Sequence, residues 1–546
     1  MTTMRFERVA VLEAVFWAVV AIVITLVSSA SHASDLRIVA KSGDFAPDYV
    51  PNAHFDFIRS VALDNEGNAT VVASLDVNTG GRFRRGIWTE AFADSLTLVA
   101  VEGQAVPEAG GNAKYFKFGN VYFSKTGSIT YTAQLTNGTS SSGLWHRDAQ
   151  GIELIAAEGT QAPGFPAGSL LGAFELSNDS PAIAVNDFGD LAILVGTAGV
   201  GIGLWTGNAE SGLELQAITG QAMAGFPEED VLENFSSSGI YGTILGMDDQ
   251  GNVVFHGYTK NRPTSIGSGP NGLWQTGDDG LHLILREGME LPGDESQLVI
   301  GIYVDGSSSS SGVLPLIVAT RDDSGFSTHV MLLEDGALTP VLASGTPAPG
   351  GGAEINSFFG SISVNDSHQT IVRGAFGNTT ALWSNFRGGA QELVVQELGP
   401  APDIEGPALF SNDQSSLSRP FDSQIINEIG QIAFEGYLEI GVAGVTSAND
   451  GGIWASDRLG NIRLLVREGQ QLVLSPGDTR TISQLNLSSF NDRGDLAFIA
   501  YFMDGTSAAV VSSLVAVPEP MASVLALIAS ISFLSARRIN ASRSMR

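Results

Sequence analysis

Short apolar runs separated by polar turns recur along the whole chain, and the turns are rich in Gly, Asn and Asp. The run Leu281-His282-Leu283-Ile284-Leu285 alternates apolar and polar positions around a core of leucines, which is typical of a strand with one buried face. Comparable runs follow a tryptophan that stands behind Gly-Ile, Gly-Leu or Ala-Leu. These repeat positions are Trp88, Trp145, Trp205, Trp274, Trp383 and Trp454.

The elements on either side of each tryptophan also repeat. A glycine and usually a proline follow the apolar run, as in Gly159 and Pro163, and predict a loop. A turn of the Asn-x-x-Gly type precedes the tryptophan and opens another apolar run, as in residues 427–434 and 491–498. The period is roughly 60 residues, which indicates an array of supersecondary units rather than one continuous globule. Each unit holds about four short strands, the content of one β-propeller blade.

The two ends of the array complement each other. Residues 36–48 carry the second half of a unit, without the half that contains the tryptophan. Residues 503–514 occupy the tryptophan half of a last unit, and no second half follows them. Such half-units can pair and close a ring, which removes the open edges of the sheets. The sequence therefore predicts an all-β fold over residues 34–516, a β-propeller of about eight four-stranded blades closed by its N- and C-terminal half-units.

One irregular unit leaves a seven-bladed ring open as an alternative. Around residues 303–349, His329-Val330-Met331 replaces the tryptophan triplet, and we expect the turn at Asp305-Gly306, ahead of a serine run. Variable Gly, Ser, Pro and Asn segments are interpreted as surface loops first and binding loops second. These segments are residues 136–142, 261–271, 307–311, 403–419 and 439–451.

Composition narrows the class of function. The chain has 546 residues, of which 43% are hydrophobic, and a formal net charge of -30, so a nucleic-acid partner is not expected because phosphates would be repelled. It contains no cysteine, which excludes disulfides, a thiol nucleophile and cysteine-bound zinc. The seven histidines show no metal-ligand spacing.

The N-terminal segment, residues 1–33, is interpreted as a secretory signal peptide. Arg5 and Arg8 precede a long apolar run, and the segment ends in Ser31-His32-Ala33, so cleavage is expected after Ala33. An uncleaved membrane anchor is the alternative, although Glu13 interrupts the apolar run.

The C-terminal segment, residues 517–546, carries a second targeting pattern. A Pro-Glu-Pro motif precedes an apolar stretch of transmembrane type, and a basic cluster follows. This order resembles the PEP-CTERM sorting signal of Gram-negative bacteria. The resemblance implies processing by an exosortase, a membrane protease, and delivery to the cell surface. The residues concerned are Val517, Pro518, Glu519, Pro520, Arg537 and Arg538.

The repeats themselves resemble the tandem-repeat surface proteins named for the Asn-x-x-Gly-x-x-Ala-Phe pattern, which carry interchangeable C-terminal anchors. That resemblance spans most of residues 36–514 and implies no catalytic residues.

The tryptophans could stack against sugars, but packing between blades is the favoured interpretation. Likewise, the Asn/Asp/Gly turns could bind calcium, but tight turns are favoured. We assign no catalytic, cofactor-binding or metal-binding residue and no cofactor.

These observations predict a non-catalytic, exported protein of the cell surface or extracellular matrix, with exopolysaccharide or surface proteins as partners. The terminal helices would hold it in the membrane before processing. A polysaccharide-active hydrolase or lyase on a propeller scaffold is the alternative, because acidic residues are plentiful although no pair stands out. The discriminating feature would be unmatched Asp, Glu, His or Arg side chains at one end of the central channel.

Overall fold

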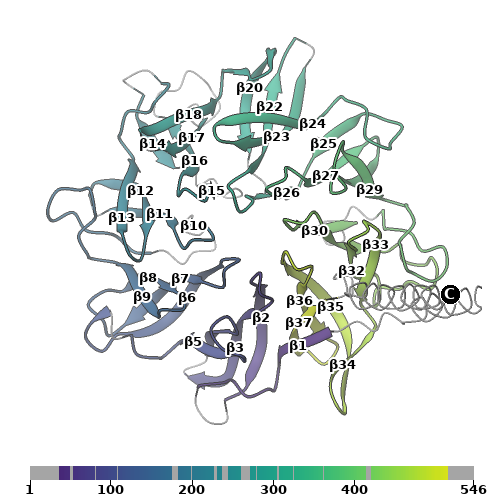
Figure 1. Cartoon of the computed structure of the whole chain (residues 1–546), viewed down its shortest axis with the longest axis horizontal. Helices are drawn as coiled ribbons and strands as arrows, with labels where there is room; N and C mark the ends of the chain where they lie inside the picture. Colours follow the sequence, from purple (N-terminus) through teal and green to yellow (C-terminus); the bar gives the residue numbers. More distant parts are fainter. Residues whose placement is uncertain are drawn as a thin grey trace, which may run out of the picture.

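Eight β-sheets, antiparallel apart from the short β21–β26 pair, surround one central axis in the computed structural model, so the chain forms a β-propeller (Figure 1). The structure describes residues 36–513 except 50–52, 80–81, 107–108, 175–182, 198, 227–229, 236–243, 260–270, 278, 304–305, 324, 361 and 413–419. In this part of the chain, no helix is long and apolar enough to cross a membrane. The predicted signal peptide and sorting signal lie outside the described residues.

The first four blades follow one another along the chain. Blade 1 holds β2 (Phe55–Leu63), β3 (Ala69–Thr79), β4 (Arg82–Thr89) and β5 (Thr97–Val101). Blade 2 holds β6 (Lys114–Phe123), β7 (Ile129–Thr136), β8 (Ser142–Arg147) and β9 (Ile152–Ala157). Blade 3 holds β10 (Ile183–Val185), β11 (Leu191–Thr197), β12 (Gly201–Asn208) and β13 (Gly212–Ile218). Blade 4 holds β14 (Leu232–Phe235), β15 (Ile244–Met247), β16 (Val253–Thr259), β17 (Asn271–Gly277) and β18 (Gly280–Arg286).

The last four blades complete the circle. Blade 5 holds β19 (Glu290–Leu291), β20 (Asp294–Tyr303), β22 (Leu314–Arg321), β23 (Phe326–Glu334) and β24 (Ala337–Ala343). Blade 6 holds β25 (Ile355–Phe358), β26 (Ile362–Val364), β27 (Thr370–Phe376), β28 (Thr379–Ser384) and β29 (Glu392–Gln396), and β21 (Gly306–Ser307) pairs with β26. Blade 7 holds β30 (Phe421–Ile426), β31 (Ile432–Tyr437), β32 (Gly451–Ser456) and β33 (Ile462–Arg467). Blade 8 holds β34 (Gln471–Ser475), β35 (Asp478–Phe490), β36 (Leu496–Phe502), β37 (Ser507–Ser512) and β1 (Leu36–Lys41).

The ring is closed by the two ends of the array, as predicted. Strand β1 pairs antiparallel with β37, from Leu36 opposite Ser512 to Lys41 opposite Ala508. The N-terminal strand is therefore the outermost strand of the last blade. Ala40 of this strand packs in the apolar core shared by blades 8 and 1. The closure leaves no blade with a missing fourth strand, which protects the sheet edges.

The irregular unit is a complete blade, so the ring has eight blades and the seven-bladed alternative is wrong. Met331 pairs with Leu316, directly after the same register irregularity that precedes the tryptophan in the other blades, and it is 1% exposed. The turn, however, differs from the one predicted at Asp305-Gly306: Gly306 lies in β21, and Asp305 lies outside the described residues. The turn lies at Ser309–Gly312, where the Gly312 N–H donates to the Ser309 carbonyl at 3.2 Å and the Ser309 Oγ accepts from Val313 N at 3.1 Å. Ser309 thus takes the position that an asparagine holds in blades 3, 6, 7 and 8, as Ser124 does in blade 2, and residues 307–311 are not an ordinary variable loop.

Candidate functional site

The turns between the first and second strands of the blades gather at one end of the central axis. Their first residue is often an asparagine that serves two blades at once. The Asn491 Oδ1 accepts from the N–H groups of Arg493 at 3.1 Å and Asp495 at 2.8 Å, which fixes its own turn. Its Nδ2 donates to the carbonyl of Asp64 in blade 1 at 2.9 Å. Asn427 donates in the same way to the Asn491 carbonyl, also at 2.9 Å.

This double use gives a physical reason for asparagine at the position. A carboxylate can accept the N–H groups of the turn, but it has no donor for the neighbouring blade. The side-chain oxygens of Asn427 and Asn491 accept backbone N–H groups of their own turns, which agrees with the tight-turn interpretation favoured above. No group of acidic or histidine side chains that could hold a metal ion occurs in the described ranges.

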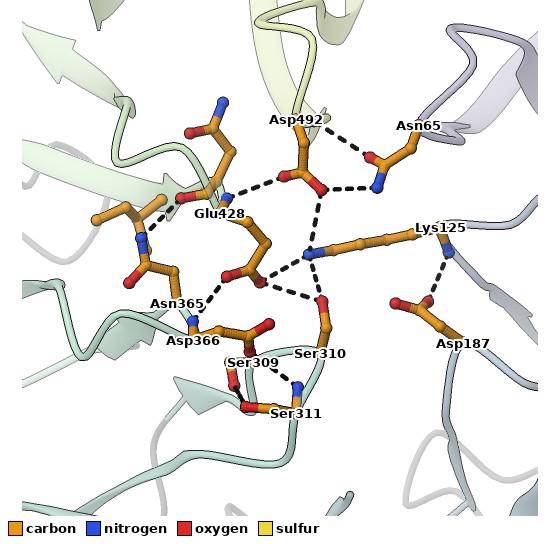
Figure 2. Close-up of polar contacts among 12 residues, drawn as sticks. Asn65, Lys125, Asp187, Ser309, Ser310, Ser311, Asn365, Asp366, Glu428 and Asp492 are labelled. Atoms are coloured by element: carbon orange, nitrogen blue, oxygen red, sulfur yellow. Dashed lines mark hydrogen bonds and ion pairs between the residues drawn. The ribbon is translucent and has the colours of Figure 1, made fainter. Parts of the chain in front are cut away.

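The second residue of each turn lies at this end of the axis, and together these residues form what we call the turn ring; Figure 2 shows all of them except Asp249. Five members are acidic and only one is basic. In blade order, the turn ring consists of Asn65, Lys125, Asp187, Asp249, Ser310, Asp366, Glu428 and Asp492.

Lys125 of blade 2 reaches across the turn ring to the opposite blades (Figure 2). Its Nζ lies 2.6 Å from the Ser310 Oγ of blade 5 and 2.7 Å from the Glu428 Oε1 of blade 7. The Asp492 Oδ2 of blade 8 lies 3.8 Å away. These side chains are 32%, 18% and 21% exposed for Lys125, Glu428 and Asp492, so the ion pairs are partly shielded from water. One ammonium therefore links four blades.

The acidic members of the turn ring have a shared structural task. Four of the five accept a backbone N–H from the preceding blade: Asp187 from Lys125 at 2.8 Å, Glu428 from Asp366 at 2.6 Å and Asp492 from Glu428 at 2.9 Å. Asp366 receives Ser311 N in the same manner at 2.8 Å. Four carboxylates at this end are thus engaged in joining blades.

The charges of the turn ring act on one another. Burial raises the pKa of Asp249, and the like charges of Asp187, Asp366 and Asp248 raise it further, against the opposing effect of Lys125. For Asp366, burial alone would raise the pKa, but hydrogen bonds from Ser309 and Ser311 outweigh it and leave the pKa lowered. The turn ring is therefore an excess of negative charge held together by a single lysine and by backbone N–H groups.

The six repeat tryptophans lie inside the blades. All six are 0% exposed. Most indoles also tie their blade to the preceding Gly/Pro loop: the Nε1 of Trp88 donates to the Pro47 carbonyl, and that of Trp383 to the Pro349 carbonyl, both at 3.1 Å. Trp205, Trp274 and Trp454 make the same bond to Pro163, Ala224 and Pro402. With their faces covered, these rings offer no platform to a sugar.

One repeated residue was missed by the sequence reasoning. A glutamate stands directly before the loop glycine in four units, as Glu102, Glu158, Glu287 and Glu468, and it hydrogen-bonds the third strand of its blade. Glu468 accepts from Gly451 N and Glu102 from Arg85 N, both at 3.1 Å. Glu158 accepts from the Ser142 Oγ at 2.9 Å. The recurring Glu-Gly pair was the available signal.

Solved structures share the architecture at low sequence identity. The β-propeller domain of the trilobed protease from Pyrococcus furiosus is 9% identical over 76% of this chain and 99% of that chain, with a TM-score of 0.38. The Dos1 propeller is 12% identical over 84% of this chain and 93% of that chain, with a TM-score of 0.36. An oligogalacturonate lyase in complex with manganese is 11% identical over 75% of this chain and 99% of that chain, with a TM-score of 0.33. At such identities the similarity is one of fold alone.

Sequence comparison places the chain more specifically. No curated protein matches it. One family model matches twice, over residues 25–161 and 122–524, and the two matches overlap inside the repeat array. Because they extend over most of the propeller, the chain belongs to that family, which is described as "Family of unknown function (DUF7453)".

Proposed function

We propose that the chain is a non-catalytic binding protein of the cell surface or extracellular matrix, with exopolysaccharide or surface proteins as ligands. The observation that supports this most is the use of the turn ring. Asp187, Asp366, Glu428 and Asp492 all accept backbone N–H groups, and Lys125 is paired with Glu428. A general acid and base would need carboxyl groups free to exchange protons with a substrate.

The same topology leaves the opposite end of the axis for recognition. The loops between second and third strands lie at that end, because successive strands of a blade are antiparallel. They include residues 137–141 and 438–450, which differ in length and composition from their counterparts. Loops that vary on a rigid scaffold are the usual place for binding specificity.

Export and sorting are part of the proposal and depend on the terminal sequences. A signal peptide would take the chain across the inner membrane, and the PEP-CTERM pattern would present it to an exosortase. The test is N-terminal sequencing and intact-mass measurement of the protein from its native host. A mature N-terminus at Ser34 and loss of residues after the Pro-Glu-Pro motif are the expected results, whereas an unprocessed chain would contradict the sorting role.

The binding role is tested on a glycan array with the full-length chain purified in mild detergent. We expect retention of one glycan class at concentrations where a denatured sample shows none. Absence of binding to every glycan, together with capture of a defined surface protein from the host, would replace exopolysaccharide by protein as the ligand.

A further inference from the structure

Aligned through their hydrogen-bonded registers, the blades show one position that is apolar in some and ionisable in others. On the second strand of each blade, one residue pairs with the tryptophan position of the third strand. The position in question is the residue that directly follows it on the second strand. In blade 7, Trp454 pairs with Phe434 and the next residue is Glu435. In blade 6, Trp383 pairs with Val372 and the next residue is Arg373. The other blades carry Val72, Thr132, Leu194, His256, Ile317 and Ile499 there.

A second register position lies beside it on the first strands, which are nearest the axis. Phe421 pairs with Gly436, directly after Glu435, and the residue that follows Phe421 on β30 is Asp422. Because successive residues of a strand face opposite sides, this residue turns away from the blade core. We call the corresponding residues of five consecutive blades, 5 to 8 and then 1, the axial row: Tyr303, Phe359, Asp422, Asn486 and Arg59.

The axial row is accessible, unlike the tryptophans. Tyr303 is 44% exposed, and the side chain of Asp422 is 60% exposed. Arg59 and Asn486 are exposed, and Phe359 is half-buried. Two aromatic side chains are thus followed by a carboxylate, an amide and a guanidinium on neighbouring strands. The turn ring offers no such mixture, since it has no aromatic member.

Buried groups hold this row in position from behind. The Arg373 Nη1 lies 3.8 Å from the Asp422 Oδ1, and its Nε donates to the Phe359 carbonyl at 3.2 Å. At the other end, the Arg59 Nε donates to the Ser74 Oγ at 2.7 Å. Residues oriented by packed neighbours are what a binding site needs, because less side-chain freedom is lost when the ligand binds.

An aromatic pair supports the arginine end of the row. Phe57 and Tyr501 stack with ring centres 5.5 Å apart, and the Arg59 guanidinium lies 6.0 Å from the Phe57 ring centre. Glu435 accepts from Leu487 N, on the first strand of blade 8. The supported part of the row therefore runs without a break over blades 6, 7, 8 and 1.

We propose that the axial row binds a neutral oligosaccharide, with Tyr303 and Phe359 against the faces of the sugar rings and Asp422, Asn486 and Arg59 hydrogen-bonded to their hydroxyl groups. Sugar rings pair an apolar face with a rim of donors and acceptors, which matches aromatic and polar side chains in sequence. The net charge of -30 disfavours an anionic polysaccharide. This inference depends on the proposed binding function and names its site and ligand class.

The test is calorimetric titration of the full-length chain with cello-, xylo- and chito-oligosaccharides of about five sugar units, and with galacturono-oligosaccharides as the anionic contrast. Tyr303→Ala and Asp422→Ala should each weaken binding at least tenfold. Matched controls lie on the turn-ring end: Phe188→Ala, for an aromatic side chain 72% exposed, and Asp249→Ala should leave affinity within twofold. Thermal midpoints show that each variant is folded, and Tyr303→Ala leaves the Arg373 ion pair untouched.

The outcomes separate the site from the function. Binding by the wild type that both axial-row variants retain would overturn the site and leave the binding function standing. No binding to any oligosaccharide would overturn both the site and the glycan-binding function. Preference for the galacturono-oligosaccharides would contradict the neutral ligand. Cleavage that Asp422→Ala abolishes would make the row catalytic, contrary to the proposal.

Discussion

At the scale of single residues, Glu435 shows how an ionisable group becomes costly inside a propeller. Burial raises its pKa to about 7, the hydrogen bond from Leu487 N works in the other direction, and the charges of Asp422 and Glu468 add to the rise. The folded state therefore binds a proton more tightly than the unfolded state does. Stability should be greatest below about pH 4.5 for this group and fall as the pH rises through 7.

Glu435→Gln should remove that loss, since glutamine keeps an oxygen for Leu487 N and never carries a charge. We expect the free energy of unfolding of the wild type to fall by up to about 3 kcal/mol between pH 5 and 8 as a result of this group. The variant should lack most of this decline in urea titrations at the two pH values. Equal slopes for both proteins would show that Glu435 titrates normally in the folded state.

Asn427 is a second residue whose role follows from its chemistry. It is 2% exposed, accepts Gln431 N at 2.7 Å and donates to the Asn491 carbonyl. Asn427→Asp keeps the side-chain oxygen that accepts Gln431 N. It replaces the donating amide group by an oxygen that faces the Asn491 carbonyl oxygen. A loss of about 2–4 kcal/mol is expected in chemical unfolding. The same change at the exposed Asn137 should cost little, and an equally mild effect at both positions would contradict the link between blades.

At the scale of elements, the seam between β1 and β37 closes the ring, because it brings the N-terminal strand into the last blade. Ala40 is 1% exposed in this seam. Ala40→Glu should bury an unpaired charge there, lower stability by about 3 kcal/mol or more, and speed amide hydrogen exchange in β37. Leu459→Glu, at a position 81% exposed, is the control. Unchanged exchange in β37 would mean that the ring does not depend on the seam.

Elements were also what the sequence predicted best. The repetition of tryptophans, Gly/Pro loops and Asn-x-x-Gly turns allowed the blades and the closure of the ring to be predicted, because the same pattern recurs in successive units. Blade 5 was the exception. Its Ser309 caps the turn with a hydroxyl, as Ser124 does in blade 2, but the unit also lacks the tryptophan, and the turn was assigned too early, at Asp305-Gly306.

The candidate sites were less predictable, for a physical reason. Lys125 occupies a turn position like any other, and only the circular arrangement brings it to Ser310 and Glu428, residues far away in the sequence. The axial row depends likewise on strand registers, including irregularities within the strands, that shift side chains by one position. Counting acidic residues could not show which of them face the axis.

At the scale of the whole molecule, the turn ring acts as a closure across the axis. Lys125→Met should leave Glu428 and Asp492 without their counter-ion and lower stability by about 1–2 kcal/mol. Added salt should restore part of the loss, because screening weakens the repulsion among the remaining carboxylates. Thermal unfolding at two salt concentrations measures both effects. Lys114→Met, at an exposed position, should change neither, and a salt-independent Lys125→Met would contradict the electrostatic account.

The central claim is that this family member binds without catalysing. The most direct measurement is mass spectrometry of the neutral oligosaccharide panel after long incubation with the full-length chain, at concentrations where binding is saturated. The account predicts that every oligosaccharide keeps its mass while it remains bound. Shortened or unsaturated products that require the folded protein would contradict the claim and identify the chain as a polysaccharide-active enzyme.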